Sequence, residues 1–198
     1  MNHLAHFFLA RRSAEAVVGA FLGDFVKGKI QANDFPEEMR VEIMVHRYVD
    51  GFTDADERIL RSKEFFRKTR RRFTGIALDV AFDHFLARNW NIYTNENLRG
   101  FTQNVYRDLS LNLHYFPPNF QTFLPRMIAD DWLASYKDFA RVKFSLQRMS
   151  LRVRGGESLA QAFEEIKTNY DFFDELFKEF FPRLQNFVIE KRKDISRE

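Results

Sequence analysis

The spacing of the apolar residues restricts the fold of this chain more than any other feature. Between its few helix-breaking residues, apolar side chains recur at intervals of three and four, as on one face of an α-helix, and do not alternate as in a half-buried strand. Only 8 Gly and 5 Pro interrupt 198 residues. We therefore expect an all-α fold, a single-domain helical bundle over residues 1–198 with a frayed C-terminal end.

Residues that cap or end helices predict where these elements lie. Ser13 is a preferred N-cap, and glycine at position 28 is suited to ending the helix that follows. The expected helices cover residues 14–28, a segment with Pro36 in its first turn, residues 62–72, 75–90 and 97–109, a segment that starts at residues 117–118, residues 130–153, and a last helix after Ser158 that Pro182 bends or interrupts.

The chain contains no cysteine, and this excludes a disulfide framework, a thiolate zinc site, an iron–sulfur cluster and a cysteine nucleophile. No run approaches the roughly 18 apolar residues of a membrane-spanning helix. The apolar N-terminal stretch has neither a basic region before it nor a small-residue cleavage site after it. We expect a cytoplasmic protein without a membrane segment, and the sequence leaves its oligomeric state open.

Three ionisable residues, Asp79, Asp83 and His84, interrupt the otherwise apolar segment of residues 76–86. A helix that is apolar all round is normally buried, and Asp79 and Asp83 lie only about 40° apart on such a helix. Burying unpaired carboxylates costs several kcal/mol each, so the pair needs a cation, an arginine or a shared proton. One divalent metal ion would satisfy both carboxylates. The alternative is that either aspartate pairs with an arginine or caps a neighbouring helix.

A second polar pair, His46 and Asp50, is separated by four residues and so shares one face of a helix. His6 and Asp24 stand in similarly apolar surroundings and are further candidate ligands. Imidazole and carboxylate without thiolate suit Mn²⁺, Fe²⁺, Mg²⁺ or a catalytic Zn²⁺. The alternatives are a hydrogen-bonded packing histidine for each of the two imidazoles, and a solvated helix-end acid for Asp24.

Basic residues are concentrated between residues 58 and 72, where the net charge is +7. Such a segment should attract a polyanion or an acidic protein and speed the encounter. A solvated helix face is the alternative. No zinc-finger spacing, RNA-binding signature or glycine-rich phosphate loop accompanies it, so we expect no nucleic-acid partner.

The chain resembles the acyl carrier protein phosphodiesterase family in four sequence blocks: NHLAHFFLA at residues 2–10, GDFVKG at 23–28, HRYVDGFTD at 46–54 and LDVAFDHFLARNW at 78–90. The likeness extends through the aromatic C-terminal helix, over nearly the whole chain. The resemblance implies a variant of the HD-type metal-dependent phosphohydrolase fold. It also implies Mn²⁺-dependent removal of 4′-phosphopantetheine from the serine of holo acyl carrier protein, a partner that is acidic and helical.

The resemblance also implies roles for particular residues. The metal would be held by His46, Asp83, His84 and Asp24, together with His6 or Asp79. Asp24 or Asp50 would act as the base that takes the proton of the attacking water or orients a ligating imidazole. Lys27 and Arg47 would bind the phosphate, and Arg70, Arg71 and Arg72 would dock the acidic carrier protein by charge complementarity.

Two other functions are compatible with the same residues. The first is an HD-like phosphohydrolase that keeps the metal site but acts on a nucleotide or another small phosphoester. The second is a non-enzymatic helical module that binds a polyanion through the basic segment, with the buried acids paired to arginines.

Overall fold

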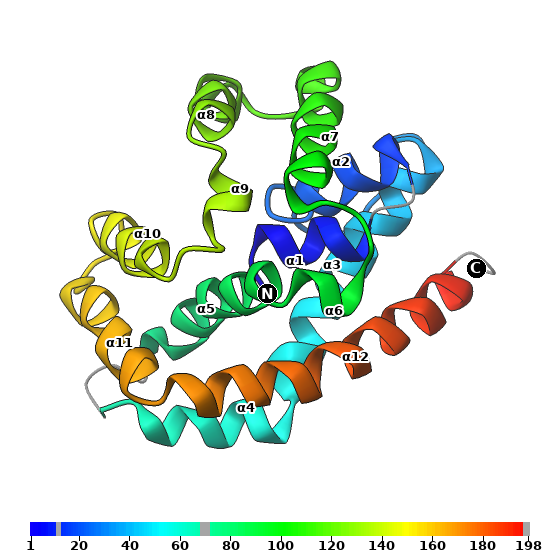
Figure 1. The fold of residues 1–198 in the computed structure, drawn as a ribbon. Helices are drawn as coiled ribbons and strands as arrows, with labels where there is room; N and C mark the ends of the chain where they lie inside the picture. Colours follow the sequence, from blue (N-terminus) through cyan, green and yellow to red (C-terminus); the bar gives the residue numbers. More distant parts are fainter. Residues whose placement is uncertain (11–12, 68–71, 196–198) are drawn as a thin grey trace.

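The computed structural model describes residues 1–10, 13–67 and 72–195, and within these ranges it contains helices and no strand (Figure 1). The expected all-α class is confirmed. The elements are α1 (His3–Leu9), α2 (Ala14–Leu22), α3 (Glu37–Ala55), α4 (Glu57–Ser62), the 3₁₀ turn η1 (Lys63–Phe65), α5 (Thr74–Arg88), α6 (Trp90–Tyr93), α7 (Leu98–Leu111), η3 (Leu113–Tyr115), α8 (Pro118–Ala129), α9 (Trp132–Ser135), α10 (Ala140–Ser150), α11 (Glu157–Thr168) and α12 (Tyr170–Ile195).

Helix α5 lies in the interior, as its apolar sequence predicts, and α1 packs directly against it. Helix α2 packs on α3, and the long helix α12 crosses both α3 and α5 (Figure 1). Buried phenylalanines fill the space between α5 and α12, among them Phe82, Phe177 and Phe180. The N-terminal helix is thereby enclosed by the rest of the bundle, which brings its side chains next to those of α3.

The end of helix α12 is fixed to the bundle by a buried ion pair. The Arg192 guanidinium donates to both carboxylate oxygens of Glu42 on α3, at 2.5 and 2.8 Å, and to the carbonyl oxygen of Leu9 at 2.6 Å. Glu42 is buried, so this bidentate contact supplies the partner that its charge requires. No helix in the described ranges combines the length and the apolar character needed to cross a bilayer.

The helix that begins after Ser13 is shorter than expected. Ser13 caps α2 by accepting from the Ala16 N–H, as predicted, but the helix ends at Leu22 and not near Gly28. A tertiary contact accounts for the early end of the helix. The Arg47 guanidinium donates hydrogen bonds to the carbonyl oxygens of Val26, at 3.0 Å, and Gly28, at 2.7 Å, which are therefore not used within a helix. Residues 24–28 therefore form an irregular loop held against α3.

The expected long helix over residues 130–153 is wrong. The chain turns at Asp131, whose φ of 39° is left-handed, and forms the short α9 before α10 begins. The Asp131 carboxylate accepts hydrogen bonds from Thr102 and Tyr106 of α7. These hydrogen bonds to α7 stabilise the turn, and the helical spacing of the sequence does not predict them.

Two smaller expectations are also corrected. A helix does not begin at Ser62, which is the last residue of α4 and donates its hydroxyl back to the Ile59 carbonyl. The C-terminal segment forms two helices, separated at Asn169, and Pro182 lies inside α12 without ending it. The domain extent over residues 1–198 stays a prediction.

Candidate metal centre

Two histidines and an aspartate meet where α1 packs beside α3. One ligand atom from each of His6, His46 and Asp50 lies within 4.8 Å of the others. Nε2 of His6 is 3.2 Å from Oδ1 of Asp50, and Nε2 of His46 is 3.3 Å from Oδ2 of the same carboxylate. The expected proximity of His46 and Asp50 is confirmed, and the fold adds His6 from a different helix.

The orientation of the His46 ring is set by the backbone of α2. Nδ1 of His46 lies 2.7 Å from the carbonyl oxygen of Ala20, which can only accept, so Nδ1 carries the proton. In the neutral ring Nε2 is then an acceptor that faces two carboxylates, Asp50 and, at 3.7 Å, Asp24. Acceptors that face one another need a proton or a cation between them. The donor set therefore fits a divalent cation, whose ligating imidazoles are commonly oriented by a backbone carbonyl in this way.

Gly23 makes room for this imidazole. A Cβ atom built on Gly23 would lie 2.3 Å from Cγ of His46 and 2.6 Å from its Cβ, closer than atoms can approach. The glycine is therefore required by packing and not by its backbone angles, which are ordinary right-handed helical values. The sequence includes Gly23 in the block GDFVKG but does not reveal which ring will lie against it.

The environment keeps His6 neutral and Asp50 ionised. Burial and the neighbouring His46 lower the pKa of His6 to about 4. Burial by itself would raise the pKa of the Asp50 carboxyl, but its contacts with His46, His6 and the Met1 ammonium outweigh burial and hold that pKa well below its usual range. A neutral imidazole and a carboxylate are the forms in which these groups bind metal.

Asp24 and His3 form a second pair beside this cluster. Nδ1 of His3 is 3.4 Å from Oδ2 of Asp24. Burial raises the pKa of Asp24, but its contact with His3 outweighs this and brings the value down to about 2. Burial lowers the pKa of His3, and the contact with Asp24 more than compensates, so that the net shift is upward. No spacing rule relates His3 to residue 24, so the sequence does not reveal this pair.

Both residues line an aromatic cleft of about 480 Å³ that opens next to the cluster. The aromatic cleft is bounded by Phe21, Phe25, Phe120 and Trp132, with Arg148 and Arg152 on the side of α10. A ligand in this space would lie against aromatic rings and beside Asp24, which is 42% exposed. The cleft therefore gives an extended molecule access to the cluster.

The structure places Asp79 at the edge of the cluster and not within it. Oδ1 of Asp79 lies 3.0 Å from the Met1 α-amino group, which is also 3.2 Å from Oδ1 of Asp50. Burial raises the pKa of the Asp79 carboxyl, and the Met1 ammonium opposes that shift. The carboxylates of Asp50 and Asp79 thus share an ion pair with the Met1 ammonium at the edge of the cluster.

Asp83 caps helix α1. Its carboxylate oxygens accept hydrogen bonds from the Leu4 and Ala5 N–H groups at 2.9 and 3.0 Å. Burial raises the pKa of Asp83 to about 7, although these two hydrogen bonds work against the shift. This is the helix-capping alternative weighed for the buried aspartates, and a ligand role for Asp83 stays a prediction.

His84 faces away from the cluster. Its Nδ1 lies 2.7 Å from the carbonyl oxygen of Tyr136, and its Nε2 lies 2.7 Å from the Tyr170 hydroxyl. Both ring nitrogens therefore have protein partners, and burial lowers the pKa of His84. A metal-ligand role for His84 stays a prediction, and these two contacts do not favour it because they occupy both ring nitrogens.

The residues expected to bind the phosphate, Lys27 and Arg47, and those expected to dock the carrier protein, Arg70, Arg71 and Arg72, have different surroundings. The Arg47 guanidinium donates to the carbonyl oxygens of residues 26 and 28 and thereby holds in place the loop that contains Asp24. Lys27 is exposed on that loop. Arg72 donates to the carbonyl oxygen of Arg154, at 2.5 Å, and stacks over Phe73. Arg70 and Arg71 lie outside the described residues.

Comparison with known proteins agrees with the sequence blocks. Residues 1–184 match the family model described as acyl carrier protein phosphodiesterase. A protein of that name from Yersinia pestis is 34% identical over 185 residues, which are 93% of this chain and 95% of that protein. Another from Serratia proteamaculans is 32% identical over 193 residues, 97% of this chain and 100% of that protein. A third, from Pectobacterium atrosepticum, is 31% identical over 93% of this chain and 95% of that protein. No solved structure matches the chain significantly.

Proposed function

Because the chain belongs to the acyl carrier protein phosphodiesterase family, we propose that it hydrolyses the phosphodiester that joins 4′-phosphopantetheine to the serine of holo acyl carrier protein. The oxygen of water bonds to phosphorus, and the bond between phosphorus and the serine oxygen breaks. The serine oxygen takes up a proton. The products are apo carrier protein and free 4′-phosphopantetheine.

The observation that carries this proposal is the convergence of His6, His46 and Asp50 beside the aromatic cleft. These three residues, with Asp24 next to them, would hold a divalent cation, and we propose Mn²⁺. When bound, the cation supplies Lewis-acid activation of water and of the phosphoryl group. The HD-type variant of the fold stays part of this proposal.

Asp24 is the residue best placed to accept the proton of the attacking water. It is ionised at neutral pH, since its pKa is about 2, and its carboxylate lines the aromatic cleft. His3 contacts that carboxylate and orients it. Asp50 contacts both histidines of the cluster and therefore positions them, which assigns different tasks to the two aspartates.

The aromatic cleft would take the arm of the prosthetic group. The arm is uncharged beyond its phosphate and carries a gem-dimethyl group, so aromatic walls suit it. Its phosphate would lie at the cluster, and the arginines that line the cleft are Arg148 of α10 and Arg152, which follows the end of that helix. Lys27 remains a proposed phosphate contact from the loop.

Mass spectrometry of holo carrier protein tests the function directly. Holo protein incubated with this enzyme and Mn²⁺ should lose 4′-phosphopantetheine, and a chelator should abolish the conversion. The His46→Ala variant should be inactive, whereas His114→Ala, which removes an exposed histidine outside the cluster, should retain activity. Hydrolysis of small phosphoesters without conversion of holo protein would replace the carrier with another substrate.

A further inference from the structure

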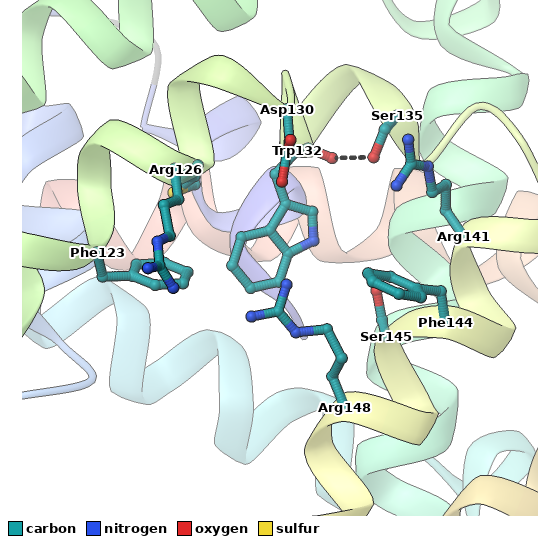
Figure 2. A pocket seen from close by; sticks show the side chains of 10 residues that line it. Phe123, Arg126, Asp130, Trp132, Ser135, Arg141, Phe144, Ser145 and Arg148 are labelled. Carbon is teal, nitrogen blue, oxygen red and sulfur yellow. Dashed lines mark hydrogen bonds between the residues drawn. The ribbon is translucent and has the colours of Figure 1, made fainter.

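A second hollow continues from the aromatic cleft between α8, α9 and α10. It encloses about 250 Å³ and shares Phe123, Trp132, Ser145 and Arg148 with the cleft. Arg126, Arg141 and Phe144 also line it, and Figure 2 shows the three guanidinium groups around the Trp132 indole. We refer to this surface, formed by Arg126, Arg141, Arg148, Phe123, Trp132 and Phe144, as the arginine groove.

The arginines of this groove lack counterions. Across residues 1–10, 13–67 and 72–195, neither an ion pair nor a side-chain hydrogen bond satisfies Arg126, Arg141 or Arg148. Other arginines of the described part of the chain do pair with carboxylates, as in the contacts of Arg183 with Asp56 and Arg192 with Glu42. Asp130 is the acidic residue that lines the groove. Three unpaired cations beside one carboxylate leave a local excess of positive charge.

The floor of the groove is aromatic. Phe144 is 47% exposed, and the guanidinium carbons of Arg141 and Arg148 lie 5.9 and 5.6 Å from the centre of its ring. Exposed aromatic rings combined with arginines are the composition of protein-binding surfaces. Like charges held together without counterions repel one another, so an anionic partner that binds here would relieve that repulsion.

We propose that the arginine groove docks an acidic segment of the carrier protein next to its modified serine, which deepens the function proposed above and depends on it. The arm itself does not account for Arg126 and Arg141, which do not line the aromatic cleft, because its single phosphate would lie at the cluster. The carboxylates of an acidic partner supply the missing counterions. Since the groove is continuous with the cleft that contains Asp24, a segment bound here keeps its serine close to the cluster.

Binding of fluorescently labelled holo carrier protein, measured by anisotropy, tests the proposal separately from turnover. The double variant Arg126→Glu/Arg141→Glu should weaken binding by about tenfold or more at low salt. At about 1 M salt the difference should shrink, because the Debye length falls to roughly 3 Å. The matched double variant Lys167→Glu/Lys193→Glu makes the same change of net charge at exposed positions of α11 and α12 and should bind like the parent protein.

The outcomes separate the two proposals. Equal weakening by both double variants, or unchanged binding in the groove variant, would overturn the docking assignment. A carrier protein with lysine in place of the acidic residues beside its serine should recover affinity for the groove variant, and failure to do so would also count against it. If the parent protein binds the carrier through the groove but never converts it to the apo form, the docking surface stands and the proposed reaction fails.

Discussion

The imidazole rings of His6 and His46 stack face to face, with centroids 3.8 Å apart and 10° between their planes. Burial disfavours a charge on His6, and two stacked imidazolium ions would also repel each other, so the pKa of His6 falls to about 4. Both rings direct Nε2 toward Asp50. The arrangement brings two ring nitrogens and a carboxylate together, which are the ligand types that bind a divalent cation.

Loss of one stacked ring should remove the metal. We expect His46→Ala to weaken Mn²⁺ binding by more than about 100-fold, because ligating groups contribute more than the outer partners whose loss costs about 10–100-fold. Isothermal titration calorimetry with Mn²⁺ measures this, with His114→Ala as the control. Mn²⁺ affinity unchanged by His46→Ala would exclude the cluster as the metal site.

A methyl group at position 23 should act on the same site through packing. Gly23→Ala forces its Cβ against the His46 ring, so we expect a loss of about 1–3 kcal/mol of folding free energy together with weaker metal binding. Gly51→Ala is the matched control, since no atom lies within 4 Å of a Cβ there. Alanine in that helix interior should stabilise the protein by roughly 0.5–1 kcal/mol. In urea denaturation, the change in unfolding free energy relative to the parent protein should be negative for Gly23→Ala and positive for Gly51→Ala.

Asp83→Ala should destabilise the metal-free protein. The substitution leaves the Leu4 and Ala5 N–H groups buried without an acceptor, at a cost of about 1–3 kcal/mol. Asp83→Asn retains one acceptor oxygen and should lose less. Urea unfolding in the presence of a chelator measures the effect without any metal contribution. Equal stability of the three proteins under chelator would contradict the capping role.

Acidification should destabilise the fold through His84. Its pKa lies below the ordinary value of 6.5 in the folded protein, so between the two values the unfolded chain binds more protons. The free energy of unfolding therefore has its full value, as far as His84 is concerned, above about pH 6.5. It decreases as the pH falls below this value, by at most about 1.4 kcal/mol per pH unit.

The His84→Gln variant isolates this contribution, because its amide offers a donor and an acceptor but does not titrate in this range. We expect the unfolding free energy of the parent protein, measured between pH 7 and pH 5, to fall more steeply than that of the variant. Parallel pH profiles would show that His84 does not titrate between these states.

The sequence by itself determined the helical class, since an apolar period of three to four residues with few glycines and prolines excludes an extended sheet. It also placed His46 and Asp50 on one face, because residues four apart on a helix are neighbours whatever surrounds them. Apolar sequence surroundings likewise marked the polar residues His6, Asp24 and Asp83 as residues that need partners.

Only the tertiary structure decided which partners these residues meet. His6 lies beside His46 and Asp50 because α1 packs against both α2 and α5. The spacing of residues within α1 or α3 does not predict this contact between helices. Asp83 and His84 are adjacent in sequence, yet one caps α1 and the other contacts Tyr136 and Tyr170. The same cause underlies the turn at Asp131, where a carboxylate bound to α7 outweighs the helical propensity of the surrounding residues. Helical periodicity fixes which side chains share a face, whereas the packing of one helix on another fixes what that face touches.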